Sequence, residues 1–122
     1  MARKNTSARI KVAEAQMRYL RVAPRKVRLI ADAIRGKSVA EARNVLAFTL
    51  KPGVVPHIDR LLKSAVANAK HGDPAINTDE LLVGDIQVDS GPIMKRWHPR
   101  AYGRAGRILK RTSHVRLTLT ES

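Results

Sequence analysis

Hydrophobic residues recur at two different spacings along this chain, and the spacings divide it into helical and extended regions. Between residues 24 and 72 the apolar positions lie three and four residues apart, which is the spacing of one helix face. Within residues 9–21, 82–88 and 115–119 they alternate with other residues, as in a half-buried strand. The pattern therefore predicts an α+β chain whose helices are flanked by strands.

Three helices are expected in the helical region. The first begins at Pro24 and ends at Gly36, because proline suits the first turn and glycine suits the C-terminal end. The second follows Ser38, which forms a capping box with Glu41, and the third extends from about residue 55 to 71. The residues expected to face the core are Val27, Ile30, Ala31, Ile34, Ala42, Val45, Leu46, Leu50, Ile58, Leu61, Leu62, Ala65, Val66 and Ala69.

The strands carry a weaker pattern. In residues 9–21 the apolar positions change parity after Val12, which predicts a bulge or bend near the middle of the strand. The inward positions of this strand are then Ala13, Ala15, Met17 and Tyr19. Those of the two later strands are Leu82, Gly84, Ile86 and Val88, and Val115, Leu117 and Leu119.

A long segment, residues 89–114, separates the last two strands. It has no helical pattern, and Pro92, Pro99, Gly103 and Gly106 would interrupt a helix. The simplest arrangement continues both strands outward as a two-stranded ribbon with its turn near residues 99–103. Such a ribbon is marginal alone, and this one carries like charges, so an anionic partner is expected to order it. We place the extended β-hairpin at residues 91–108 of a single domain, 9–122, that follows a flexible basic arm, 1–8.

Positive charge is concentrated at the two ends of the chain. The formal net charge of the 122 residues is +14, and the calculated pI is about 11.3. Residues 1–28 hold nine Lys or Arg and one acid, and residues 93–116 hold eight and no acid. The centre is close to neutral. A field of this sign and distribution indicates a polyanionic partner.

Catalytic and metal-binding chemistry is poorly represented. The chain has no Cys, no nucleophile–base set and no glycine-rich phosphate loop. Asp85 and Asp89 are too far apart on one strand to share a proton or a metal, and His98 has no second ligand nearby. No apolar run has the length of a membrane span. We therefore expect a soluble, non-enzymatic protein without cofactor, metal or membrane partner.

The kind of polyanion follows from the side chains of the ribbon. Arginine outnumbers lysine there, and arginine suits bidentate phosphate contacts and stacking on bases. Trp97, His98 and Tyr102 are interleaved with the arginines, and unstacked RNA bases could stack on such planar groups. The alternative is an architectural DNA-binding protein whose basic β-ribbon inserts Pro99 as a wedge.

Two stretches resemble a known family. They are PRKVRLIADAIRGKSVAEARNVL, residues 24–46, and GPIMKRWHPRAYGRAGRILKRTSHVRLTL, residues 91–119. Both closely resemble the bacterial type of large-subunit ribosomal protein L-twenty-two, and the resemblance extends over nearly the whole chain from Arg9. It implies an α+β fold: three helices packed on a small three-stranded antiparallel sheet, with a long protruding β-hairpin.

The resemblance also implies a function. The protein would bind large-subunit ribosomal RNA, bridge its domains during assembly, and lie in the cytoplasm within the large subunit. The hairpin would line the nascent-peptide tunnel beside ribosomal protein L-four. The candidate RNA-binding residues are Arg18, Arg21, Arg25, Lys26, Arg28, Lys95, Arg96, His98, Arg100, Arg104, Arg107, Lys110, Arg111 and Arg116. The candidate tunnel-lining tip consists of Arg96, Trp97, His98, Pro99, Arg100, Ala101, Tyr102 and Gly103.

Overall fold

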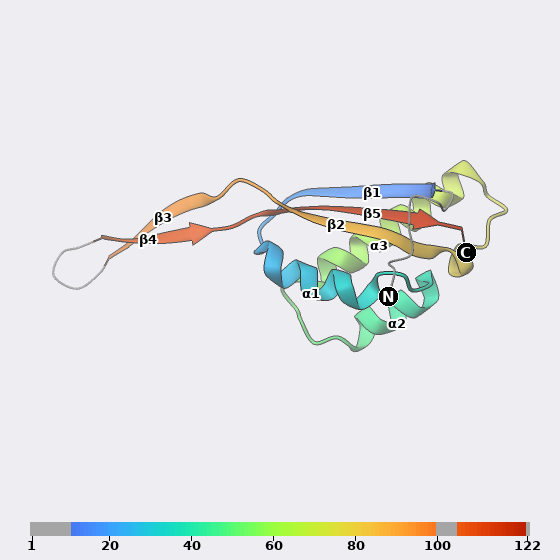
Figure 1. Cartoon of the computed structure of the whole chain (residues 1–122), viewed down its shortest axis with the longest axis horizontal. Helices are drawn as coiled ribbons and strands as arrows, with labels where there is room; N and C mark the ends of the chain where they lie inside the picture. The colour runs from blue at the N-terminus through green and yellow to red at the C-terminus, as the bar shows by residue number, and fades with distance from the viewer. Residues whose placement is uncertain (1–10, 100–104, 122) are drawn as a thin grey trace, which may run out of the picture.

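The predicted α+β fold is confirmed by a computed structural model of the chain (Figure 1). It describes the backbone of residues 11–99 and 105–121 and the side chains of residues 11–95 and 109–121. The proposed arm at residues 1–8 lies outside these ranges. The elements follow in the order β1 (Lys11–Leu20), α1 (Pro24–Ile34), α2 (Val39–Phe48), α3 (Val55–Gly72), the 3₁₀ turn η2 (Thr78–Glu80), β2 (Leu82–Ser90), β3 (Met94–Pro99), β4 (Ala105–Lys110) and β5 (Ser113–Thr120).

The core lies between one antiparallel sheet and the helices on one of its faces. The strand order is β1-β5-β2, so the C-terminal strand β5 is central and pairs with both neighbours. Helix α3 packs on β1 and β5, while α1 packs on β2 (Figure 1). Val115, Leu117 and Leu119 are buried as their alternation predicts, whereas Arg116 on the opposite face is exposed. The domain is therefore a two-layer structure with one polar sheet face.

The helices begin and end close to the predicted positions. Helix α1 has Pro24 as its first residue, and Gly36, with φ +80°, follows its end. The hydroxyl of Ser38 accepts a hydrogen bond of 3.3 Å from the Glu41 amide, the part of the predicted capping box that organises α2. All predicted inward residues of α1 and α3 are buried.

The predicted burial of one residue of the second helix, Leu50, is wrong. Leu50 is 91% exposed because α2 ends at Phe48 and the chain leaves the helix before residue 50. The helical spacing that would have brought Leu50 inward therefore no longer applies there. Phe48, the last helical residue, is also 86% exposed. Ala42 and Leu46 are buried, and Val45 packs partly against the core.

The pairing of β1 is irregular at two places, of which the first coincides with the predicted change of parity after Val12. Its register with β5 shifts between Lys11 and Ala13 and again between Met17 and Leu20. At the second shift Tyr19 adopts a positive φ of 59°, which turns its side chain out and brings Leu20 into the core. The predicted inward position of Tyr19 is therefore wrong, although Ala13 and Ala15 are buried as expected.

The predicted inward positions of the second strand are also partly wrong, because a register shift interrupts it. The pairing of β2 with β5 shifts between Val83 and Asp85, at Gly84. A Cβ atom on Gly84 would meet the Thr120 side chain within 3.0 Å, so only glycine fits this close approach. Before the shift it is Val83, not Leu82, that is fully buried, and after it Ile86 and Val88 are buried. The prediction that inward and outward residues alternate strictly from Leu82 onward is therefore wrong.

Beyond the domain, β3 and β4 form a second antiparallel sheet of two strands, here called the ribbon. It continues the directions of β2 and β5 and extends away from the helices (Figure 1). Its register pairs Met94 with Lys110 and Pro99 with Ala105. The predicted turn falls largely in residues 100–104, outside the described residues.

The neck between domain and ribbon is closely packed. The Gly91 amide donates to the Thr112 carbonyl at 2.9 Å, and the Thr112 hydroxyl donates to the Pro92 carbonyl at 2.6 Å. A Cβ atom on Gly91 would lie 2.5 Å from Thr112 Oγ1 and 3.2 Å from the His114 ring. A residue without a side chain is therefore needed where the two strands leave the domain.

Candidate nucleic-acid interface

Five of the predicted RNA-binding residues flank the connection between β1 and α1. Strand β1 ends at Leu20 and α1 begins at Pro24, so a three-residue turn carries the chain from sheet to helix. All five side chains are exposed, which leaves them accessible to a polyanion. They are Arg18, Arg21, Arg25, Lys26 and Arg28.

Two guanidinium groups also attach α1 to the edge of the sheet. Arg28 Nη2 donates to the Val88 carbonyl at 3.0 Å, and Arg35 Nη2 donates to the Ile86 carbonyl at 2.8 Å. Both carbonyls belong to β2, an edge strand of the sheet. A guanidinium has five N–H donors, so one intramolecular bond leaves Arg28 able to bind phosphate. Its predicted RNA contact is compatible with this structural role.

The exposed sheet face carries a cluster of opposite charges. Glu14 on β1 forms an ion pair with Lys11 and lies 3.4 Å from Arg116 Nε on β5. Hydrogen bonds from Lys11 and Gln16 hold the pKa of the Glu14 carboxyl below its ordinary value, so the group is ionised near neutral pH. Glu14 therefore offsets part of the Arg116 charge, and we rank Arg116 below the cations that flank the β1–α1 connection as an RNA contact.

Contacts between Tyr19 and His114 hold the end of β1 against β5, close to Arg18 and Arg116. The Tyr19 amide donates to His114 Nδ1 at 3.1 Å, and the two rings meet edge to face with centroids 4.9 Å apart. The hydrogen bond and the ring contact give His114 a structural role. Arg18 and Arg116 line the adjacent depression together with Asp89.

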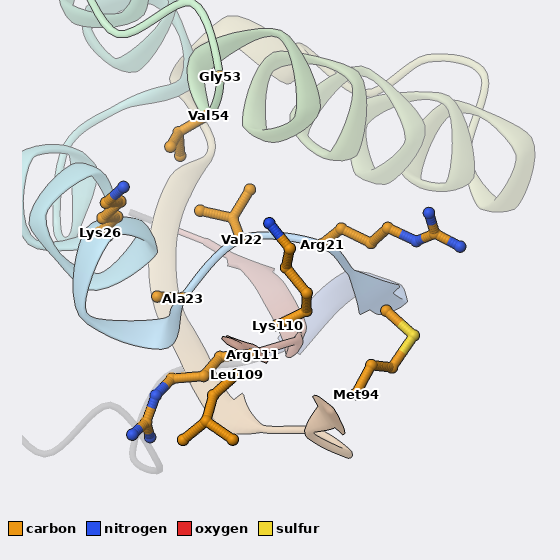
Figure 2. A pocket seen from close by; sticks show the side chains of 10 residues that line it. All are labelled: Arg21, Val22, Ala23, Lys26, Gly53, Val54, Met94, Leu109, Lys110 and Arg111. Carbon is orange, nitrogen blue, oxygen red and sulfur yellow. The ribbon is translucent and has the colours of Figure 1, made fainter. Parts of the chain in front are cut away.

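A larger pocket lies where the domain meets the base of the ribbon, and we call it the junction pocket (Figure 2). Its cavity volume is about 660 Å³. In Figure 2, Lys26 and Arg111 stand on one side and Arg21 and Met94 on the other, with Lys110 between them. The lining therefore contains four cations, and no carboxylate is among the described residues that form it.

The remaining lining of the junction pocket is apolar. Val22, Val54 and Leu109 belong to this lining, and Leu109 comes from β4, below the two valines in the view of Figure 2. Val54 is buried, Val22 is half-buried, and Leu109 is 42% exposed. The apolar members were missed at the sequence level, since only the folded chain brings residues 21–26, 53–54 and 109–111 together.

The predicted ribbon residues are placed to different extents. Lys95 is exposed on β3, and Lys110 and Arg111 are exposed at the end of β4. For Arg96, Trp97, His98, Pro99 and Arg107 the structure describes the backbone alone, with Arg96 opposite Ile108, Trp97 opposite Arg107 and His98 opposite Gly106. Five further predicted residues lie outside the described residues: Arg100, Ala101, Tyr102, Gly103 and Arg104.

Other kinds of site find no support in the described structure. Among the side chains that the structure describes, in residues 11–95 and 109–121, no group of three or more His, Asp or Glu could hold a metal ion. No helix in these ranges combines the length and hydropathy needed to cross a membrane. Exposed cations lie around the β1–α1 turn and at the base of the ribbon. They form the part of the described surface that is best suited to bind a ligand.

The sequence of the chain is similar to those of known ribosomal proteins. The family described as "Ribosomal protein L22p/L17e" matches residues 15–120. A protein of Desulfitobacterium hafniense called "Large ribosomal subunit protein uL22" is 50% identical over 109 residues, which cover 89% of this chain and 94% of that protein. A protein of the same name from Caldicellulosiruptor saccharolyticus is 46% identical over 117 residues, covering 96% of this chain and 94% of that protein.

Proposed function

The chain belongs to the L22p/L17e family of ribosomal proteins, and on this premise we propose that it is a structural, non-catalytic constituent of the large ribosomal subunit that binds ribosomal RNA. One observation supports RNA binding above the others. Four exposed cations from the two basic regions meet at the junction pocket without an acidic neighbour in its lining. A surface of this kind neutralises several phosphates at once.

The separation of the basic regions supports a bridging role in assembly. One set of cations is fixed to the globular domain at the β1–α1 turn, and another is carried by the ribbon, which extends away from that domain (Figure 1). A single chain can therefore contact RNA segments that lie apart and hold them in one arrangement. We include Arg18, Arg25, Lys95 and Arg116 among these contacts.

The RNA-binding proposal predicts a steep salt dependence. If about ten Lys or Arg side chains reach phosphates, the logarithm of the affinity should fall against the logarithm of salt concentration with a slope of roughly −7 to −9. The measurement is a filter-binding titration of the full chain on a large-subunit rRNA transcript, with duplex DNA as control. A slope near −2 would reject the multi-contact model, and equal affinity for duplex DNA would favour the architectural DNA-binding alternative.

We further propose that the hairpin, residues 91–108, lines the nascent-peptide tunnel, with residues 96–103 as its tip near protein L-four. The two-stranded ribbon supports this placement, because a narrow arm free of the helices can enter a channel in RNA that the domain itself cannot enter (Figure 1). We take this channel to be the nascent-peptide tunnel because of the family resemblance.

Photo-crosslinking tests the tunnel proposal. A benzophenone side chain at position 97 or 102 of assembled ribosomes should attach covalently to a stalled nascent peptide. The same group at position 48 should not, because Phe48 is exposed on the domain, at the end of α2 (86% exposed). Crosslinks at position 48 alone, or at none of the three positions, would contradict the proposed placement.

A further inference from the structure

The junction pocket has two kinds of lining that suit two parts of one ligand. Arg21, Lys26, Lys110 and Arg111 line it with positive charge, and Val22, Val54 and Leu109 add apolar side chains, here called the apolar floor (Figure 2). Cations alone would serve a phosphate backbone passing over the surface. The apolar floor suits in addition a ligand with an apolar face, which gains free energy by leaving water.

The size and position of the pocket restrict the ligand further. Its volume of about 660 Å³ lies within the roughly 300–1,000 Å³ typical of sites for single small ligands. The pocket also joins the two basic regions, since Arg21 comes from the β1–α1 connection, Lys26 from the first turn of α1, and Lys110 ends β4. A polyanion bound to both basic regions can therefore pass across this opening.

We propose that the junction pocket takes one unstacked nucleotide of the bound RNA. Its base lies on the floor formed by Val22, Val54 and Leu109, and the phosphates on either side of it lie against the four cations. This inference rests on the proposed function, because the RNA must first be bound. RNA is the suitable polyanion, since its loops and bulges present unstacked bases that duplex DNA keeps in the stack.

Two glycines allow a test that leaves every cation in place. Gly53 lines the pocket and Gly72 ends α3 away from it, and a Cβ atom added at either would meet nothing within 4 Å. Gly53→Phe should occupy part of the space that the base needs and lower the affinity of the full chain for the rRNA transcript roughly tenfold. Gly72→Phe is the matched control and should bind like the wild type.

A second variant removes the floor rather than filling the space. Leu109→Ala shortens a side chain that is already 42% exposed, so folding should be retained, and affinity should fall several-fold. For both variants the slope of affinity against salt should equal that of the wild type, since no phosphate contact is removed. Dimethyl sulfate probing should show one base protected by the wild type and by Gly72→Phe but reactive with Gly53→Phe.

The outcomes separate this inference from the function it rests on. If the wild type binds the transcript weakly and without steep salt dependence, the RNA-binding function itself fails. If the wild type binds with a steep slope while Gly53→Phe and Leu109→Ala bind equally well, the nucleotide site alone is overturned. Identical protection of every base by wild type and Gly53→Phe would overturn it in the same way.

Discussion

Replacing Arg21, Lys26, Lys110 and Arg111 together by glutamine should weaken rRNA binding roughly 200- to 1,000-fold at about 0.15 M salt. Each cation that reaches a phosphate contributes about 0.7–0.9 to the salt slope, so four contribute about 3 to 3.6. At this salt concentration a slope change of that size corresponds to two to three decades in affinity. All four side chains are exposed, so the fold should be unaffected.

The control for this variant changes charge equally at another place. Arg43, Arg60, Lys63 and Lys70 lie on α2 and α3, outside the junction pocket, and their replacement by glutamine also lowers the net charge by four. We expect this control to retain most of the affinity and most of the salt slope. If the two quadruple variants lose affinity equally, total charge and not its placement at the junction pocket determines binding.

Leu117→Ala should lower the free energy of unfolding by roughly 3–5 kcal/mol. Leu117 is fully buried at the middle of β5, the central strand, where it pairs with Ala15 of β1 and Ile86 of β2. Truncation there leaves a cavity that the sheet cannot close, because strands fix the backbone on both sides. Domains of this size are typically stable by only about 5–15 kcal/mol, so the loss is a large part of the total.

Urea unfolding of the free chain measures this effect, and the neighbouring residue supplies the control. Thr118 lies on the same strand with its side chain on the opposite face and only partly buried. Thr118→Ala should therefore change stability by less than about 0.5 kcal/mol. Equal losses for the two variants would mean that the sheet face toward the helices does not form the core.

Most of the core could be predicted because its periodicity is regular. The stripe of α3, from Ile58 to Ala69, and the alternation of β5 at Val115 and Leu117 both follow undisturbed elements. Prediction failed where the backbone departs from regular geometry. The shifts at Tyr19 and Gly84 each change which residues face inward, and Leu50 falls just beyond the end of its helix. Such departures depend on tertiary packing, which no local spacing records.

The candidate site could likewise be predicted only in part from the sequence. Its cations were identifiable from charge alone, because the two basic clusters contain only one acidic residue between them, Glu14. The apolar floor was not identifiable, because Val54 and Leu109 are ordinary residues until the fold places them beside Arg21. The distances between the clusters along the chain also conceal that Arg21 and Arg111 line one opening.

The pairing of Ser90 with Ser113 has a consequence for how far the ribbon can reach. This pair is the last one between β2 and β5 in the three-stranded sheet. The 22 residues between its members, 91–112, therefore form a single insertion between two core strands. Doubling the length of such a loop costs only about 0.6 kcal/mol in closure entropy. Adding two residues to each strand would extend the ribbon by about 6–7 Å and preserve side-chain parity. Arm length and domain stability can therefore change almost independently over evolution.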